Sequence, residues 1–162
     1  MKKTQVNLLL VDDEDALLNS IQRRLQIRDF NVIAVNRGEK ALAAARIHPL
    51  DVAILDLKMP GLSGKDVLIA LKQDYPWLEV IILTGHGSFD PESEKEFGKA
   101  YTYLSKPCGL DTLLQTLVEA YKKTVMNRKG ITPEGMASCL SQVGAAEPRD
   151  VLQKLMEIDG NG

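Results

Sequence analysis

Apolar residues gather into five short runs along the first two thirds of the chain, and stretches with helical spacing separate them. The runs lie at Val6–Val11, Asn31–Val35, Asp51–Asp56, Glu79–Thr84 and Tyr101–Leu104. Their length and their content of branched aliphatic residues predict β-strands. The first, third and fourth runs are almost continuously apolar, which is typical of strands buried on both faces. Strands that alternate with helices predict a parallel sheet covered by helices on both sides.

Between the predicted strands, apolar side chains recur at the spacing of amphipathic helices. The positions are Leu17, Leu18, Ile21 and Leu25; Ala41, Leu42 and Ala45, with Arg46 beside them; Val67, Leu68 and Leu71; and Leu110, Leu113, Leu114, Leu117, Val118 and Tyr121. The stretch Phe89–Gly98 predicts a further helix from a weaker pattern. The fold class is therefore α/β, with a doubly wound sheet.

Polar side chains that could bind a ligand or take part in a reaction lie at the ends of the predicted strands. Asp12 and Asp13 follow the first, Asp56 ends the third, Thr84 ends the fourth and Lys106 follows the fifth. Ligands of such sheets bind beyond the carboxyl ends of the strands, so these side chains are expected to converge there. Carboxylates that close repel each other, and Mg²⁺ bound by carboxylates, water and phosphate oxygens would offset the repulsion. The set predicts a phosphoryl-transfer site with an acid as nucleophile.

Each of these residues also has a simpler interpretation. Asp12 could cap the first helix, because Asp is a favoured N-cap. Thr84 could be an ordinary strand residue, and Lys106 an ordinary loop residue. Asp56 could belong to a turn. The combination of all of them at strand ends favours the chemical interpretation.

Composition limits the class of protein. The chain has 162 residues, of which 44% are hydrophobic and 26% charged, which fits one globular domain with a modest extension. A net charge of −2 gives no reason to expect nucleic acid or an acidic membrane as partner. Cys108 and Cys139 have no metal-binding spacing, and Cys108 is expected to be inert. The first apolar run is too short for a signal peptide or a membrane span, so a cytoplasmic location is expected.

Four motifs occur in the order LLLVDDED, ILDLKMPGLSG, VIILTGHGS and YTYLSKP, each at the end of a predicted strand. In this order and spacing they resemble the receiver domain of two-component response regulators, similar to single-domain chemotaxis-type receivers. The resemblance covers roughly residues 5 to 125. It implies a flavodoxin-like five-stranded parallel sheet of order 2-1-3-4-5. We take residues 1–128 as the receiver domain and residues 129–162 as a C-terminal helical extension of unknown role, about which the resemblance says nothing.

The resemblance also implies roles for individual residues. Asp56 corresponds to the phosphoacceptor, which takes a phosphoryl group from a phosphohistidine on a sensor histidine kinase or phosphotransfer protein. Asp13 corresponds to the acid that binds Mg²⁺, with Asp12 acting mostly through water and Lys58 through its backbone carbonyl. Thr84 and Lys106 correspond to the hydroxyl and the ammonium that contact the phosphoryl group.

Further positions follow from the same resemblance. Gly85 corresponds to the small neighbour that leaves room for the phosphoryl group, and the Lys106–Pro107 peptide is expected to be cis. Tyr103 occupies the position of the aromatic switch, although it could also be a plain core residue. Lys58 and His86 occupy positions that tune dephosphorylation, although His86 could simply be a solvated loop residue. Such a receiver is a phosphoacceptor switch that supports its own phosphotransfer and dephosphorylation, and is not a conventional enzyme.

Two regions depart from the family pattern. The fourth helix reads SFDPESEKEFGKAY, in which four of the five positions 92–96 are charged. This helix, the fifth strand and the last helix form the face through which many receivers dimerise or bind targets. A homodimer is therefore possible, but its surface and the downstream target stay open.

The second departure is the tail, residues 129–162. Met136, Cys139, Leu140 and Val143 lie on one face of a helix that Thr132-Pro133 could begin. A second apolar stripe comprises Val151, Leu152, Leu155 and Met156. Two short helices suggest an αα-hairpin, and neither is long enough to be stable alone. The hairpin is expected to pack beside the last helix or across a dimer and to take part in output; the alternative is a loosely ordered appendage.

Different function classes remain open at this stage. The leading one is a phosphoacceptor switch that signals through protein contacts without binding nucleic acid directly. The alternative is the receiver fragment of a larger DNA-binding regulator or hybrid histidine kinase. A flavodoxin-like cofactor binder is disfavoured, because acids follow the first strand where a glycine-rich loop would cradle a phosphate.

Overall fold

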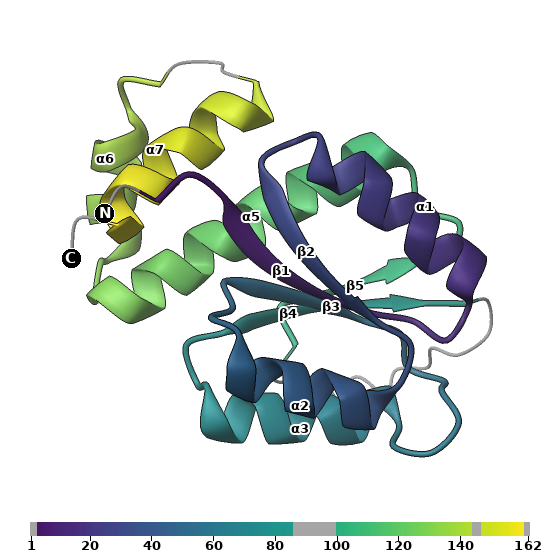
Figure 1. Cartoon of the computed structure of the whole chain (residues 1–162). Helices are drawn as coiled ribbons and strands as arrows, with labels where there is room; N and C mark the ends of the chain where they lie inside the picture. Colours follow the sequence, from purple (N-terminus) through teal and green to yellow (C-terminus); the bar gives the residue numbers. More distant parts are fainter. Residues whose placement is uncertain (1–2, 86–99, 144–146, 161–162) are drawn as a thin grey trace.

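A computed structural model describes residues 3–85, 100–143 and 147–160 of the chain. Its centre is a sheet of five parallel strands in the order β2-β1-β3-β4-β5. The strands are β1 (Val6–Val11), β2 (Phe30–Val35), β3 (Val52–Leu55), β4 (Glu79–Thr84) and β5 (Thr102–Ser105). The predicted flavodoxin-like topology is therefore confirmed, and Figure 1 shows the layers.

The strand bounds agree closely with the sequence pattern. β1 and β4 have the predicted limits, β2 starts one residue earlier, and β5 lies one residue later. β3 is shorter than predicted, because both flanking acids lie outside it. The backbone N–H of Asp51 still donates to Asn7 of β1 (2.8 Å), and that of Asp56 donates to Val11 (2.9 Å). The backbone of both acids thus continues the pairing with β1, while their side chains lie at opposite ends of the sheet.

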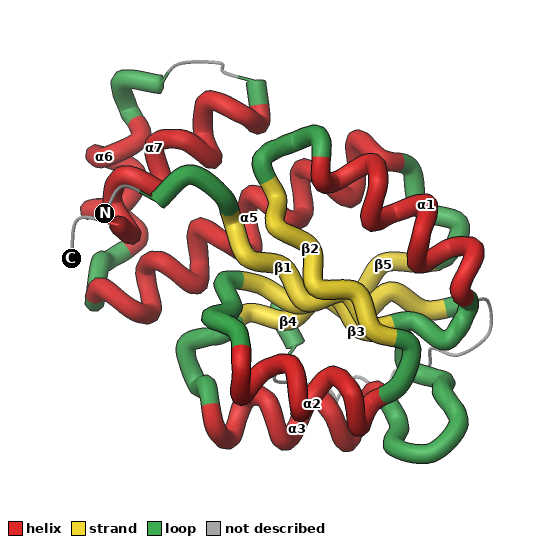
Figure 2. Tube along the Cα trace, in the orientation of Figure 1, coloured by secondary structure: helices red, strands yellow, loops and turns green. Residues whose placement is uncertain are grey.

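Helices cover both faces of the sheet, as the alternation of elements predicted (Figures 1 and 2). They are α1 (Asp15–Gln26), α2 (Gly38–Ile47), α3 (Gly64–Asp74) and α5 (Leu110–Lys129). Leu8 and Leu10 of β1 belong to the hydrophobic cluster under α1 and α5, whereas Leu9 and Val11 belong to the cluster under α2 and α3. This alternation is that of a strand buried on both faces. The helix predicted at Phe89–Gly98 lies outside the described residues.

The tail forms two helices, α6 (Pro133–Leu140) and α7 (Pro148–Gly160), as predicted. The predicted stripe of α6 is only partly correct, because the helix ends before Val143, Cys139 is exposed and Met136 is its buried residue. α5 ends at Gly130, whose φ of 63° lies in the left-handed region that glycine adopts readily. The Thr132 side chain then caps α6 by accepting a hydrogen bond from the Gly135 backbone N–H (3.0 Å), and Pro133 takes the first position of the helix. The described helices include none that is long and apolar enough to cross a membrane.

α7 packs beside α5, which confirms one of the placements expected for the tail (Figure 1). Leu152, Leu155 and Met156 are buried and share a single hydrophobic cluster with Tyr121 and Val125 of α5. α7 would not bury its stripe alone, so α5 supplies the apolar surface that stabilises it.

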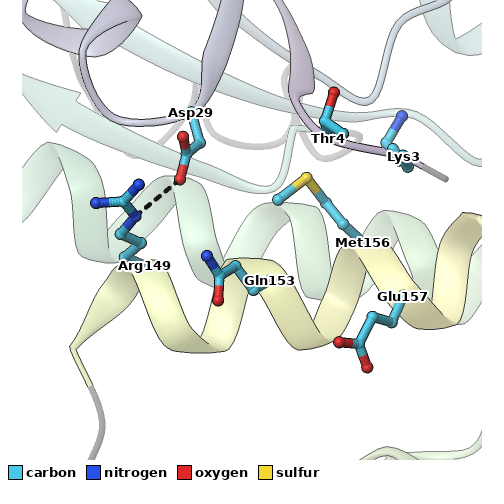
Figure 3. A pocket seen from close by; sticks show the side chains of 7 residues that line it. All are labelled: Lys3, Thr4, Asp29, Arg149, Gln153, Met156 and Glu157. Atoms are coloured by element: carbon cyan, nitrogen blue, oxygen red, sulfur yellow. Dashed lines mark hydrogen bonds and ion pairs between the residues drawn. The ribbon is translucent and has the colours of Figure 1, made fainter.

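α7 also contacts the beginning of the chain. Figure 3 shows Met156 pointing toward the N-terminal segment at Thr4 and Lys3, across a small cavity of about 280 Å³. Arg149, in the first turn of α7, forms an ion pair with Asp29 in the α1–β2 turn (Nε to Oδ2, 3.1 Å). The tail therefore closes over the end of the sheet at which the strands begin.

Charged side chains fix this end of the molecule. We call Lys3, Asp51, Tyr121, Arg128 and Asp159 the basal ion cluster. The Arg128 guanidinium donates to Asp51 (2.9 Å) and to Asp159 (2.8 Å), and the Lys3 ammonium contacts Asp51 at 2.8 Å. The Tyr121 hydroxyl donates to Asp159 (2.8 Å). The cluster joins the N-terminal segment, the start of β3, α5 and α7.

Candidate functional site

The polar residues singled out by the sequence meet at the carboxyl ends of the strands. Backbone hydrogen bonds fix the positions of two of these residues. The Asp12 N–H donates to the Val35 carbonyl (3.2 Å), and the Lys106 N–H donates to the Thr84 carbonyl (2.7 Å). Because neighbouring parallel strands end at one edge, the side chains that follow β1, β3, β4 and β5 project into the same space.

The three predicted carboxylates lie together. One oxygen from each of Asp12, Asp13 and Asp56 falls within 4.8 Å of the others. Asp12 and Asp56 are 2% and 6% exposed, whereas Asp13 is exposed. The cluster therefore has a buried floor of two acids and an open side at Asp13.

Lys106 is the cation closest to these acids among the described residues. Its Nζ lies 2.7 Å from Asp12 Oδ2 and 3.4 Å from Asp56 Oδ2. The Lys106–Pro107 peptide is cis, as the family resemblance implied. The ammonium thus bridges two carboxylates and leaves the third, Asp13, unneutralised by it.

The environment shifts the acid–base properties of the site. Burial raises the pKa of the Asp56 carboxyl, and the neighbouring charge of Asp12 raises it further, which outweighs Lys106 and a backbone hydrogen bond from Lys58. Burial alone would lower the pKa of the Lys106 ammonium, but its contacts with Asp12 and Asp56 raise it overall. The ammonium of Lys106 contacts a cluster of three acids, so the carboxylates of the cluster outnumber this cation.

Thr84 has an unused hydrogen-bonding group. Its Oγ1 is buried and has no hydrogen-bond partner in the described part of the chain. Buried polar atoms are nearly always paired, so such an atom marks a place for a further group. Gly85 follows, and no heavy atom of the described residues lies within 4 Å of the position that a Cβ there would take. The hydroxyl and the open space lie at the end of β4, where the resemblance placed the phosphoryl contact.

Two supporting residues were not identified from the sequence. A Cβ on Gly64 would lie 2.1 Å from the Asp56 carbonyl oxygen, so only glycine lets α3 begin this close to the site. Glu14 Oε1 lies 3.6 Å from Lys106 Nζ and adds a third carboxylate around the lysine. Two features of the sequence could have pointed to them: the Ser-Gly pair in ILDLKMPGLSG for Gly64, and the third acid of LLLVDDED for Glu14.

The remaining predicted residues lie less directly on the site. Tyr103 is half-buried on β5 and packs with the cluster under α2 and α3. Lys58 is exposed, and its contribution to Asp56 is the backbone hydrogen bond. His86 lies outside the described residues.

The donor set fits a hard divalent cation. All three clustered side chains are carboxylates, and Mg²⁺ prefers oxygen ligands, keeps several waters and commonly uses one or two carboxylates. The open side at Asp13 gives water and phosphate oxygens access. A soft or nitrogen-preferring metal would find no Cys or His in this cluster.

Comparison with known proteins agrees with this geometry. The chain is 36% identical over 118 residues to the transcriptional regulatory protein KdpE of Mycobacterium tuberculosis, covering 72% of this chain and 51% of that protein. It is 31% identical over 130 residues to a putative NtrX-like response regulator of Rickettsia conorii, covering 79% of this chain and 27% of that protein. The chain thus spans about half or less of these relatives.

Solved structures show the same fold. A response regulator receiver domain protein from Clostridium thermocellum superposes with a TM-score of 0.63 at 35% identity, covering 77% of this chain and 97% of that one. The response regulator TrrA from Thermotoga maritima, solved in complex with Mg²⁺-BeF, gives a TM-score of 0.66 at 26% identity, covering 72% of this chain and 99% of that one.

The family assignment rests on the sequence as well as the fold. The model of the response regulator receiver domain matches residues 8–118, which include each of the clustered acids, Thr84 and Lys106. Proteins of this family bind Mg²⁺ in an acidic pocket and receive their signal from histidine kinases. The chain belongs to the response regulator receiver family.

Proposed function

We propose that this receiver accepts a phosphoryl group on Asp56 from the phosphohistidine of a sensor histidine kinase or phosphotransfer protein, in a Mg²⁺-dependent reaction. The observation that carries the proposal is the setting of Asp56. Its buried carboxylate lies between the ammonium of Lys106 and two further acids, beside a threonine hydroxyl that has no partner among the described residues.

The residues have distinct roles in this reaction. An Asp56 carboxylate oxygen attacks the phosphorus atom, the bond from phosphorus to the histidine nitrogen breaks, and that nitrogen keeps the electron pair. The Lys106 ammonium and the Thr84 hydroxyl contact phosphoryl oxygens, and Gly85 leaves space for them. Fixed charges and donors of this kind stabilise the charge that develops on the transferring group.

The acid cluster would hold the cation. Asp13, Asp56 and the backbone carbonyl of Lys58 are the proposed ligands, with Asp12 acting through water. The cation supplies positive charge to the phosphoryl oxygens and removes the repulsion among the acids. The clustering of three carboxylates beside a single lysine ammonium supports this assignment.

A groove beside the site supports the approach of a partner protein. It has a volume of about 530 Å³ and runs between α1 and the start of α5. Leu17, Ile21 and Leu110 contribute apolar surface, and Lys106 lines the same groove. A phosphodonor bound there would lie next to the acceptor.

The output is proposed to be a conformational switch read by protein contacts. Thr84 would move toward the phosphoryl group, and Tyr103, half-buried on the neighbouring strand, would turn inward. We assign the chain to a phosphoacceptor switch in the cytoplasm that supports its own phosphotransfer and dephosphorylation, without a further enzymatic activity and without direct binding of nucleic acid. We also keep residues 1–128 as the receiver unit and residues 129–162 as an extension, although α5 itself continues to Lys129.

A second candidate has support from the comparisons. The chain spans 51% of KdpE and 27% of the NtrX-like regulator, so it could be the receiver fragment of a larger DNA-binding regulator or hybrid histidine kinase. The length of the protein made in the cell distinguishes the two. A product of about this length supports the signalling switch, and a longer one with an output domain supports the fragment.

Phosphorylation of the purified protein tests the proposed chemistry. With Mg²⁺ and acetyl phosphate, intact-mass measurement should show one added phosphoryl group, and Asp56→Asn should abolish it. The matched control is Asp74→Asn, an exposed acid at the end of α3, which should be phosphorylated normally. Chelation of Mg²⁺ should stop the reaction. Undiminished phosphorylation of Asp56→Asn would refute the assignment.

A further inference from the structure

A second groove lies where the tail meets the receiver. We call it the acid-rimmed groove; it has a volume of about 430 Å³ and runs between α5 and the start of α7. Its lining consists of Asp111, Leu114, Gln115, Val118 and Glu119 from α5, and Pro148 and Val151 from α7. Because α7 forms one wall, the groove exists only through the packing of the tail.

The groove has an apolar floor and an acidic rim. Leu114 and Val118 of the floor are 8% and 6% exposed. The two charged side chains among its lining residues, Asp111 and Glu119, are both acids. Glu119 forms an ion pair with Lys122 (2.7 Å) but remains 47% exposed. Such a groove suits an apolar side chain that is flanked by cations.

The end of α1 offers a surface of that kind. Ile27 is 78% exposed, the most exposed of the large apolar side chains in the described residues. Arg24 and Arg23, in the last turn of α1, precede this C-cap residue by three and four positions and are also exposed, so the three side chains lie close together at the end of the helix. We call Arg23, Arg24 and Ile27 the basic knob.

The knob and the groove lie on the same flank of the molecule. Arg149, next to groove residue Pro148, forms the ion pair with Asp29, which is only two residues after Ile27. Figure 1 shows the start of α7 beside the turn from α1 to β2. Two complementary patches on one flank allow a two-fold axis to pass between them, so that each subunit's knob meets the other's groove.

We propose that a second copy of this chain occupies the acid-rimmed groove, with the basic knob of each subunit inserted into the groove of the other. Ile27 contacts the floor at Leu114, Val118 and Val151, while Arg23 and Arg24 face Asp111 and Glu119. The complementary charges select this pairing and oppose knob-to-knob contact. The contact is small, so the dimer is weak and forms in a concentration-dependent manner. The proposal does not rest on the proposed phosphorylation, although Arg24 also lines the groove beside Lys106.

Sedimentation velocity without a phosphodonor tests the interface. The full-length chain should shift from monomer toward dimer as its concentration rises from micromolar to millimolar. Ile27→Asp should weaken the association at least tenfold, and because the side chain is exposed, the melting temperature should not fall. Asp74→Lys and Arg46→Glu, which change exposed charges on α3 and α2, serve as controls and should dimerise like the wild type.

A charge exchange gives a sharper test. The variant R23E/R24E carries acids on both knob and groove rim, and the variant D111K/E119K carries cations on both. Each alone should remain monomeric where the wild type dimerises. Mixed together they should form a heterodimer, because both reciprocal contacts are then matched. Light scattering or native mass spectrometry distinguishes the three species.

The outcomes separate this interface from others. Recovery of a dimer only on mixing supports the proposal. A chain that stays monomeric at every concentration overturns it, and leaves the groove to a basic segment of a different protein. A dimer that is unaffected by Ile27→Asp and by the charge variants also overturns it, because the contact then uses another face.

Discussion

Both ends of the central sheet carry buried acids, but nearby cations balance the negative charge at one end and not at the other. At the end where the strands begin, Asp51 and Asp159 are matched by two cations, Lys3 and Arg128. Neutral donors add to these ion pairs: the Asn7 backbone N–H donates to Asp51 (2.7 Å), and the Tyr121 hydroxyl donates to Asp159. This end is a completed structural cluster.

The end where the strands finish is incomplete. Asp12, Asp56 and Glu14 all approach the single ammonium of Lys106, and Asp13 adds a further carboxylate to the cluster. The Thr84 hydroxyl has no partner in the described part of the chain. β3 connects the two ends, with Asp51 before it and Asp56 after it. The contrast shows that a buried acid alone does not mark a functional site; an acid without sufficient compensation does.

Removal of the tail should have the largest effect on the balanced end. Truncation after Arg128 removes buried Leu152, Leu155 and Met156 and exposes the surface of α5 that they cover. We expect the free energy of unfolding to fall by about 4 kcal/mol, as the lost apolar burial exceeds the conformational entropy regained. Urea unfolding measures it, with the exposed substitution Gln153→Ala as control. A truncated chain that unfolds like the full chain would make the tail an appendage.

Arg128→Met should have the next largest effect. Among the described residues, it leaves Lys3 as the remaining cation beside buried Asp51 and Asp159, and it removes the contact of the guanidinium with the Trp77 ring (4.2 Å from the ring centroid). Since Arg128 is 22% exposed, we expect a loss of about 2–3 kcal/mol rather than the full cost of a broken buried pair. The comparison variant is Lys123→Met, an exposed position of the same helix. An equal loss in both variants would show that the cluster adds nothing specific.

Mg²⁺ should stabilise the incomplete end. A ligand present at a hundredfold excess over its Kd adds about 2.7 kcal/mol, which is visible as a rise in melting temperature. Asp13→Asn should leave the metal-free protein equally or more stable, because it removes repulsion, while abolishing the response to Mg²⁺. If the response to Mg²⁺ persists unchanged in Asp13→Asn, the metal ligand is wrongly assigned.

The smallest effect is expected for Asp56→Asn without metal. Burial and Asp12 raise the pKa of Asp56, so folding disfavours its charged form, and at neutral pH the ionised carboxylate lowers stability. The neutral amide should increase the free energy of unfolding by about 1 kcal/mol or less. Thermal melts in the presence of a chelator measure this gain. At the other end of β3, Asp51→Asn should instead destabilise, because Asp51 is fully paired; a loss of stability in both variants would remove the distinction between the ends.

The sequence by itself determined the strands and helices of the receiver and the candidate residues at the strand ends, while the strand order came from the family resemblance. Val6–Val11 and Glu79–Thr84 were predicted with the observed bounds, because strands buried on both faces read as continuous apolar runs. Asp12, Asp56 and Lys106 were placed together because parallel strands end at one edge. The start of α6 was also evident, since Thr132 followed by Pro133 is a local signal.

Only the tertiary structure decided which contacts hold the tail in place. Lys3, Asp51, Arg128 and Asp159 are scattered along the chain and carry no local pattern, so their convergence depends on the packing of α7 against α5 and the N-terminal segment. The close approach of Gly64 to Asp56 depends in the same way on where α3 begins. Secondary structure follows from periodicity within a segment, whereas ion pairs between distant segments follow from the positions of whole elements, which no short stretch of sequence specifies.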